Sequence, residues 1–363
     1  MSSNPEINAR HGVICALPTE RFGYFGWPSI ARQQDGTLVA AASGLRFQHV
    51  CPWGKSVLCA SRDDGQTWSG PTVVNNTPLD DRDAGIISLG GQRLALTWFT
   101  SDTTVYRAGL RKSWAPDDMR VADAIMDSWT VPMRQKWIGS WIRISEDGEY
   151  WGDFLRAPVN TPHGFIVRAD GSWLYLGKRW DLNDDGTMHV HGSPIQAARS
   201  ADEGKSWTLL GRVPLAQGLC DDDTHEPHVV ELADGALLGF LRHHKPFQIL
   251  TTKSTDGGLT WSPAQPGNIL GSPPHALRHS SGAIVCVYGY RLPPYGQRAM
   301  ISRDNGGTWQ HDIILRDDGP DGDLGYPASV ELPGGDILTV YYQKLNPGDK
   351  KCSLLYTRWQ LPL

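Results

Sequence analysis

The sequence lacks several features that define large classes of proteins. No apolar run approaches the roughly 18 residues that a membrane-spanning helix needs. Lys and Arg residues are scattered and the formal net charge is −5, so no basic stripe marks a nucleic-acid-binding face. The six cysteines form no CxxC pair, which is typical of reduced thiols rather than of a zinc site or a disulfide framework. Residues 1–23 lack the basic and apolar segments of a signal peptide, so we expect a cytoplasmic protein.

An eight-residue motif recurs along the chain. "SRDDGQTW" at residue 61 returns as "SADEGKSW" at 200, "STDGGLTW" at 254 and "SRDNGGTW" at 302, with a shorter copy, "SEDGEYW", at 145. We call this motif the Asp box. Its Asp can accept hydrogen bonds from nearby backbone N–H groups, its Gly supplies a positive φ, and its Trp buries a large ring. We therefore assign the box a structural role and no chemistry.

Pairs of short apolar segments joined by a Gly turn lie between the boxes, as in "PHVVELADGALLGFLR". Six such units occur, and 40 Gly and 25 Pro suit many short strands with tight turns. The last unit has no box; "CSLLYTRW" supplies its third strand and "GVICALP", residues 12–18, its fourth. The sequence therefore predicts an all-β fold, a six-bladed β-propeller with Asp-box repeats, as a single domain over residues 1–363.

The first two boxes lie much further apart than the others, so the second unit carries an insertion at about residues 109–137. We expect a short helix within it, near "DDMRVADAIMDSW". An insertion of this size is expected to lie over one face of the disc. It is a candidate lid and a candidate contact between two copies of the chain.

The innermost strands of a propeller begin around its central axis, where ligands bind. Aligning the Gly turns places Arg82, Asp83, Glu226 and Tyr326 there, together with several His. Grouping these side chains is costly unless they pair with one another or bind something polar. The alignment therefore predicts a polar ligand site at this mouth; a solvated rim is the alternative.

Three histidines, His163, His228 and His275, occupy matching positions in adjacent blades. Converging imidazoles could bind a transition metal, but we expect them to hydrogen-bond a sugar or the rim. "DLNDDG" at 181 fits the opening of a calcium loop, yet its twelfth position is Gly192 rather than Glu. We accordingly predict no metal and no cofactor.

In these segments the chain resembles the sialidase (neuraminidase) superfamily over essentially its whole length. "HEPHVVELADGALLGFLR" is similar to the sialidase segment in which a Glu assists the nucleophile and an Arg binds the substrate carboxylate, which implies Glu226 and Arg242. "LGYPASVELPGGDILTVYY" resembles the segment with the Tyr nucleophile and implies Tyr326. "GTLVAAASGLR" resembles the strand that ends in a substrate-binding Arg, here Arg46. "DRDAGI" is similar to the strand whose Asp contacts the glycone, here Asp83.

The chemistry of an acidic sugar is consistent with this assignment. Sialic acid carries a carboxylate on its anomeric carbon and repels an anionic nucleophile. A neutral Tyr, with a pKa of ~10, avoids the repulsion if a neighbouring carboxylate takes its proton. Arginines hold the substrate carboxylate through paired hydrogen bonds. Without the resemblance, Tyr326 is equally compatible with a core tyrosine.

The chain departs from the sialidase pattern at three places. Phe25-Gly26-Trp27-Pro28 replaces the Phe-Arg-Ile-Pro motif, so its arginine is gone. Gln343 replaces the Glu that supports that arginine, and losing both leaves no orphaned charge. The acid Asp expected after Arg46 is also absent, because "RFQHVCPWGKS" offers only His49 and Lys55.

These departures leave the proton donor and part of the carboxylate clamp to other residues. We expect His49 to donate the leaving-group proton, since a His near pKa 6.5 can act as an acid; a structural His is the alternative. Arg82 is positioned to replace the missing arginine. Arg298 is expected to be the third clamp residue, with Arg291 as its competitor.

The leading hypothesis is an exo-acting glycoside hydrolase that releases a terminal acidic sugar, sialic acid or a related keto-acid sugar, from a glycan. The first alternative is a polysaccharide lyase that acts on uronate by Tyr/His β-elimination; the missing acid Asp and the abundance of His favour it. The second is a non-catalytic sugar-binding propeller, which would not need the Glu226–Tyr326 pair.

Overall fold

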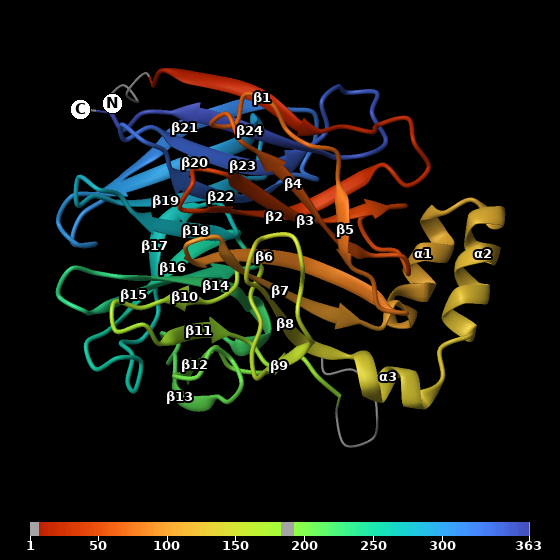
Figure 1. Cartoon of the computed structure of the whole chain (residues 1–363), viewed down its shortest axis with the longest axis horizontal. Helices are drawn as coiled ribbons and strands as arrows, with labels where there is room; N and C mark the ends of the chain where they lie inside the picture. Colours follow the sequence, from red (N-terminus) through yellow and green to blue (C-terminus); the bar gives the residue numbers. More distant parts are fainter. Residues whose placement is uncertain (1–6, 183–191, 363) are drawn as a thin grey trace.

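The computed structural model describes residues 7–182 and 192–362, and most of them form strands. The "DLNDDG" segment extends beyond the described part after Leu182. The described strands form six four-stranded antiparallel sheets arranged as blades around an axis (Figure 1). The predicted all-β, six-bladed propeller is confirmed. No helix in the described part is long and apolar enough to cross a membrane.

Each blade runs from an innermost to an outermost strand in chain order, except the last. Blade 1 contains β2 (Tyr24–Arg32), β3 (Leu38–Arg46), β4 (Lys55–Ser61) and β5 (Thr72–Asn75). Blade 2 contains β6 (Asp80–Gly90), β7 (Arg93–Ser101), β8 (Gly139–Ser145) and β9 (Leu155–Ala157). Blade 3 contains β10 (Ile166–Val167), β11 (Trp173–Gly177), β12 (Gln196–Ser200) and β13 (Thr208–Arg212). Blade 4 contains β14 (Thr224–Glu231), β15 (Leu237–His243), β16 (Gln248–Ser254) and β17 (Gln265–Leu270). Blade 5 contains β18 (Pro274–Arg278), β19 (Ile284–Tyr290), β20 (Tyr295–Ser302) and β21 (Gln310–Gly319).

Blade 6 closes the ring with strands from both ends of the chain. β22 (Gly325–Glu331), β23 (Ile337–Gln343) and β24 (Ser353–Trp359) are completed by β1 (Ala9–Cys15), which pairs antiparallel with β24. The predicted closure is confirmed. The closing strand lies a few residues earlier than the predicted 12–18, because its pairing begins with Ala9 opposite Trp359 and stops at Cys15.

The Asp boxes lie between the third and fourth strands of blades 1 to 5. In the first box, the Asp63 carboxylate accepts from the Thr67 hydroxyl at 2.6 Å and from the Thr67 N–H at 2.9 Å, and these bonds lower the pKa of Asp63 to about 2. The Trp68 indole N–H donates to the Gly65 carbonyl at 3.1 Å. The Asp63 carboxylate thus accepts hydrogen bonds from groups within its own turn, as expected of a structural motif.

Residues 103–137 connect β7 to β8 through four helical segments. These are η1 (Thr103–Tyr106), α1 (Arg107–Ser113), α2 (Pro116–Asp127) and α3 (Val131–Trp137). The helices α1 to α3 lie at one side of the disc (Figure 1). The predicted short helix corresponds to α2, which begins with Pro at its first position and Asp117 and Asp118 in its first turn, both favourable at a helix N-terminus. The contact between two copies of the chain expected here stays a prediction.

Candidate active site

Four innermost strands share a local distortion at the end where they begin. The ladder register shifts between Gly26 and Ser29 in β2, between Arg82 and Gly85 in β6, between His225 and His228 in β14, and between Gly325 and Ala328 in β22. Inside each shift one residue other than Gly has a positive φ: Trp27 (53°), Asp83 (54°), Glu226 (45°) and Tyr326 (50°).

This repeated strain points to function rather than to folding. A positive φ costs a residue with a side chain about 1–3 kcal/mol, and such residues cluster at sites where the geometry is used. β-Bulges re-aim side chains, and here all four side chains line one cavity. A tyrosine that served only the core would not need this backbone conformation at Tyr326.

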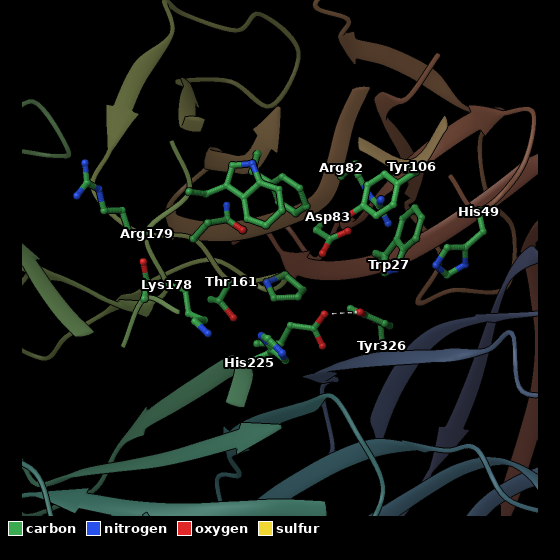
Figure 2. Close-up of a pocket in the computed structure, with 16 residues that line it drawn as sticks. Trp27, His49, Arg82, Asp83, Tyr106, Thr161, Lys178, Arg179, His225 and Tyr326 are labelled. Atoms are coloured by element: carbon green, nitrogen blue, oxygen red, sulfur yellow. Dashed lines mark hydrogen bonds between the residues drawn. The ribbon is translucent and has the colours of Figure 1, made fainter. Parts of the chain in front are cut away.

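The cavity is walled by several blades and by the insertion. It has a volume of about 210 Å³, an order of magnitude above the ~10–15 Å³ that one water needs. Blade 1 contributes Trp27 and blade 2 Asp83, η1 contributes Tyr106, and the ends of blade 3 strands contribute Lys178 (Figure 2). The space suits a sugar-sized polar ligand.

Glu226, Tyr326 and Arg242 form a buried hydrogen-bonded group. The Tyr326 hydroxyl donates to Glu226 Oε1 at 2.5 Å (dashed line in Figure 2). Arg242 Nη1 donates to Glu226 Oε2 at 2.6 Å and to the Tyr326 hydroxyl at 3.2 Å. The sequence predicts this contact between residues 100 positions apart, and the structure confirms it. Glu226 and Arg242 lie on paired strands, and Tyr326 reaches them from blade 6.

The charges in this group set the protonation states of its members. Burial on its own would raise the pKa of Glu226, but the Arg242 guanidinium and the Tyr326 hydrogen bond lower it to about 2. Burial and the Glu226 carboxylate raise the pKa of Tyr326. At neutral pH the pair is therefore a carboxylate that accepts from a neutral phenol.

Of the predicted clamp arginines, Arg82 lines the cavity, and the competitor Arg291 lies against Tyr326. The Arg82 guanidinium lies 4.6 Å from the centre of the Trp27 ring and lines the cavity. Arg291 lies 5.5 Å from the centre of the Tyr326 ring, and its Nε donates to the Leu324 carbonyl at 2.9 Å. Arg291, rather than Arg298, therefore adjoins the Tyr326 side chain.

Arg46 and Arg298 are not among the residues that line the cavity. Arg46 is 0% exposed. Its Nη1 and Nη2 atoms donate to the two oxygens of the buried Asp80 carboxylate at 2.7 and 3.1 Å. Arg298 is 4% exposed and donates to the carbonyls of Gln297, Arg316 and Pro294 at 3.2, 2.9 and 3.3 Å. The sequence predicts that both residues contact substrate; in the structure their guanidinium groups are engaged within the fold.

Asp83 is a buried carboxyl that faces the cavity. Burial raises its pKa to about 7; Arg82 opposes this effect and the Glu226 carboxylate adds to it. Among the described residues, its Oδ1 atom has no hydrogen-bond partner. Figure 2 shows Asp83 and Tyr326 projecting into the same space from different blades. A carboxyl with a free oxygen and a near-neutral pKa is suited to hydrogen bonds with ligand hydroxyls.

His49 lines the cavity next to Trp27, with 4.8 Å between the ring centres. Its Nδ1 lies 2.9 Å from Asp323 Oδ1 and 2.9 Å from the Tyr24 hydroxyl. Partial burial lowers the pKa of His49, and the Asp323 carboxylate counteracts part of that shift. The predicted proton donor is thus at the cavity, beside a carboxylate that the sequence did not single out.

The three matched histidines meet one another, but the residues that line the cavity do not include them. Ring centres of His163, His228 and His275 are 4.3 to 5.8 Å apart. His228 Nδ1 accepts from the Ala276 N–H at 3.1 Å and His275 Nδ1 from the Ser329 N–H at 3.3 Å. A neutral imidazole bonded in this way carries its proton on Nε2 and has no lone pair left for a metal. In the described part of the chain no group of three metal-binding side chains is found.

Several cavity residues were missed by sequence reasoning. Lys178 directly follows the second strand of blade 3, and Arg242 is the last residue but one of the second strand of blade 4, so a position near that strand end was a usable signal. His225 directly precedes Glu226, and Trp27 was noted only as a departure. Tyr106 lies in η1, just before the predicted insertion, and no repeat motif marks its position.

Comparisons with known proteins agree with this architecture. A family model described as a BNR repeat-like domain matches residues 143–339, more than half of the chain. A sialidase from Paraclostridium sordellii is 26% identical over 263 residues, which cover 67% of this chain and 58% of that protein. The chain thus spans less than two thirds of that relative's length.

Solved structures show the same fold at low identity. A protein of unknown function from Dyadobacter fermentans superposes with a TM-score of 0.75 at 22% identity, covering 97% of this chain and 99% of that one. The NanB sialidase from Streptococcus pneumoniae gives 0.68 at 14% identity, covering 96% of this chain and 70% of that one. Trypanosoma rangeli sialidase gives 0.62 at 16% identity, covering 97% and 59%.

Fold and matches together define a BNR-repeat β-propeller of the sialidase superfamily. The chain belongs to the family of BNR repeat-like domains.

Proposed function

We propose that the protein is an exo-acting glycoside hydrolase that releases a terminal acidic sugar, a sialic acid or a related keto-acid sugar, from a glycan. The observation that carries this proposal is the 2.5 Å hydrogen bond from Tyr326 to Glu226, with Arg242 bonded to both. In this group Tyr326 is the neutral nucleophile, Glu226 is the base that takes its proton, and Arg242 is the cation that binds the substrate carboxylate.

In the first half of the reaction, the Tyr326 oxygen attacks the anomeric carbon and its proton passes to Glu226. The bond from the anomeric carbon to the leaving oxygen breaks, and that oxygen takes a proton from His49. In the second half, water attacks the same carbon and gives a proton to His49, while Tyr326 leaves and recovers its proton from Glu226. The burial that raises the pKa of Tyr326 makes the neighbouring base necessary.

The substrate carboxylate is placed by cations around Tyr326. Arg242 and Arg291 flank the Tyr326 side chain, and Arg82 stands across the cavity over Trp27. Arginine forms paired bonds with carboxylates, so these three arginines favour an acidic sugar over a neutral one. Asp83 is assigned to the glycone hydroxyls.

Tyr326→Phe tests the proposal. The variant keeps the ring and the Glu226–Arg242 pair but loses the nucleophilic oxygen, so hydrolysis of sialyl oligosaccharides should stop while ground-state binding persists. Tyr341→Phe is the matched control, because its hydroxyl bonds Thr357 at 2.8 Å in the same blade, away from the cavity. Full hydrolysis by Tyr326→Phe would overturn the mechanism.

The same assay distinguishes the two alternative functions when sialyl and uronate oligosaccharides are both supplied. A lyase would release an ultraviolet-absorbing unsaturated sugar from uronate glycans. A sugar-binding propeller would bind the oligosaccharides and release neither that product nor new reducing ends. Only reducing ends, from sialyl substrates, agree with the proposal.

A further inference from the structure

A carboxylate fixes His49 from behind the cavity. Asp323 Oδ1 lies 2.9 Å from His49 Nδ1, and the Tyr24 hydroxyl donates to the same carboxylate at 3.0 and 3.2 Å. Tyr24 is 1% exposed, so this contact is anchored in the core of blade 1. The Asp323 backbone N–H donates to Asp321 Oδ1 at 3.0 Å, which holds the loop.

The contact decides which nitrogen of His49 carries the proton. The His49 ring and the Tyr24 hydroxyl lower the pKa of Asp323 to about 2 against the effect of burial, so the group is ionised and can only accept. The His49 nitrogen that faces it, Nδ1, therefore carries hydrogen. In the neutral ring the lone pair is then on Nε2, and in the charged ring Nε2 carries the proton that can be transferred.

We propose that Asp323 is a positioning residue: it holds His49 with Nδ1 protonated, so that Nε2 exchanges a proton with the leaving-group oxygen in the cavity. This inference rests on the proposed function, and it assigns a role to a residue with no part in the Tyr326–Glu226–Arg242 group. Asp323 lies three residues before Tyr326, so one short segment sets both the nucleophile and the orientation of the proton donor.

The charges around His49 act in opposite directions. Arg82 and Arg291 lower its pKa, while Asp323 raises it; Tyr24 faces it as a neutral hydroxyl. The acid form exists below the pKa, so activity on a substrate with a poor leaving group should fall as pH rises through that value, which lies below 6.5. Removing the Asp323 charge should lower the pKa of His49, so the fall in activity should occur at lower pH.

Asp323→Asn is the test, because asparagine keeps the size but can donate to Nδ1 and stabilise the opposite tautomer. We expect kcat/KM on a sialyl oligosaccharide to fall about 10²-fold or more, the range of acid–base catalysis. An aryl glycoside that leaves without protonation should be hydrolysed at nearly the wild-type rate. Asp318→Asn is the control. Asp318 lies on the preceding strand β21 and accepts hydrogen bonds from Arg316 and Gln343 rather than from His49, so this variant should change neither rate.

Nitrogen NMR of His49 gives a readout independent of turnover. The wild-type protein should show the neutral ring protonated at Nδ1, and Asp323→Asn should show a shift toward Nε2 and a lower pKa. Equal rate losses on both substrates, or an unchanged tautomer, would overturn the role of Asp323 even if Tyr326→Phe is inactive. If the wild type hydrolyses neither substrate, the proposed function fails, and the tautomer measurement still decides whether Asp323 positions His49.

Discussion

Replacing Glu226 by glutamine removes the negative charge that Arg242 and Tyr326 share. Arg242 and the Tyr326 hydrogen bond lower the pKa of Glu226 from its ordinary value of 4.5 to about 2, which corresponds to a stabilisation on the order of 3 kcal/mol at neutral pH. Breaking a buried ion pair by removing one partner costs about 3–5 kcal/mol, because the other charge stays buried. Arg242 is 6% exposed, so both lines of reasoning lead to a loss on the order of 3 kcal/mol.

Urea denaturation at pH 7 measures this loss as a decrease in the free energy of unfolding of Glu226→Gln. The group has a lowered pKa in the folded state, so its contribution is complete above about 4.5 and disappears as pH falls toward 2. The difference between wild type and variant should therefore shrink over that window. Glu146→Gln is the control, because Glu146 pairs with Arg93 at the surface, where such pairs contribute ~0–1 kcal/mol.

If the free energy of unfolding of Glu226→Gln lay within ~0.5 kcal/mol of the wild-type value, the range of ordinary surface substitutions, the buried ion pair would not contribute the predicted stability. The rate of hydrolysis by the same variant should fall by about 10²- to 10⁴-fold, because no base remains to take the Tyr326 proton. Loss of stability with full activity would leave the pair intact but remove Glu226 from the reaction.

Two further predictions concern the carboxylate clamp and the repeats. Arg291→Ala should raise KM for acidic glycosides by about 10- to 150-fold, the equivalent of one charged hydrogen bond of ~1.5–3 kcal/mol. Arg298→Ala should leave KM unchanged. If steady-state kinetics showed the reverse pattern, Arg298 rather than Arg291 would bind the substrate carboxylate. Asp202→Ala removes the acceptor of the Ser206 N–H and hydroxyl in the third Asp box, so thermal unfolding should show a lower Tm with unchanged kcat/KM at permissive temperature; a selective loss of activity would contradict a purely structural box.

The blades could be predicted because their signals are local. Each Asp box closes on its own carboxylate, and each Gly turn joins neighbouring strands, so counting the six pairs of strands joined by a Gly turn is enough to predict six blades. Aligned strand starts likewise predicted Glu226 and Tyr326 at one mouth, since corresponding positions in a ring of blades converge on the axis.

The clamp and the proton donor's partner could not be predicted in full, because they depend on contacts between blades. Arg46 looks like a ligand-binding residue in sequence, but Asp80 from the next blade pairs with it and keeps it buried. Arg291 and Arg298 lie seven residues apart, and only the folded turn shows that Arg291 faces Tyr326. Asp323 meets His49 across 274 positions, a distance that no local pattern spans.

The most direct test of the Tyr326 nucleophile is to trap the sugar on the protein. Incubation with an activated fluorinated acidic sugar, which forms the glycosyl–enzyme bond quickly and hydrolyses slowly, should add one sugar to the intact mass. Peptide mapping should place that sugar on Tyr326, and Tyr326→Phe should remain unmodified. A sugar attached to another residue, or release of product with no adduct at any time, would contradict Tyr326 as the nucleophile.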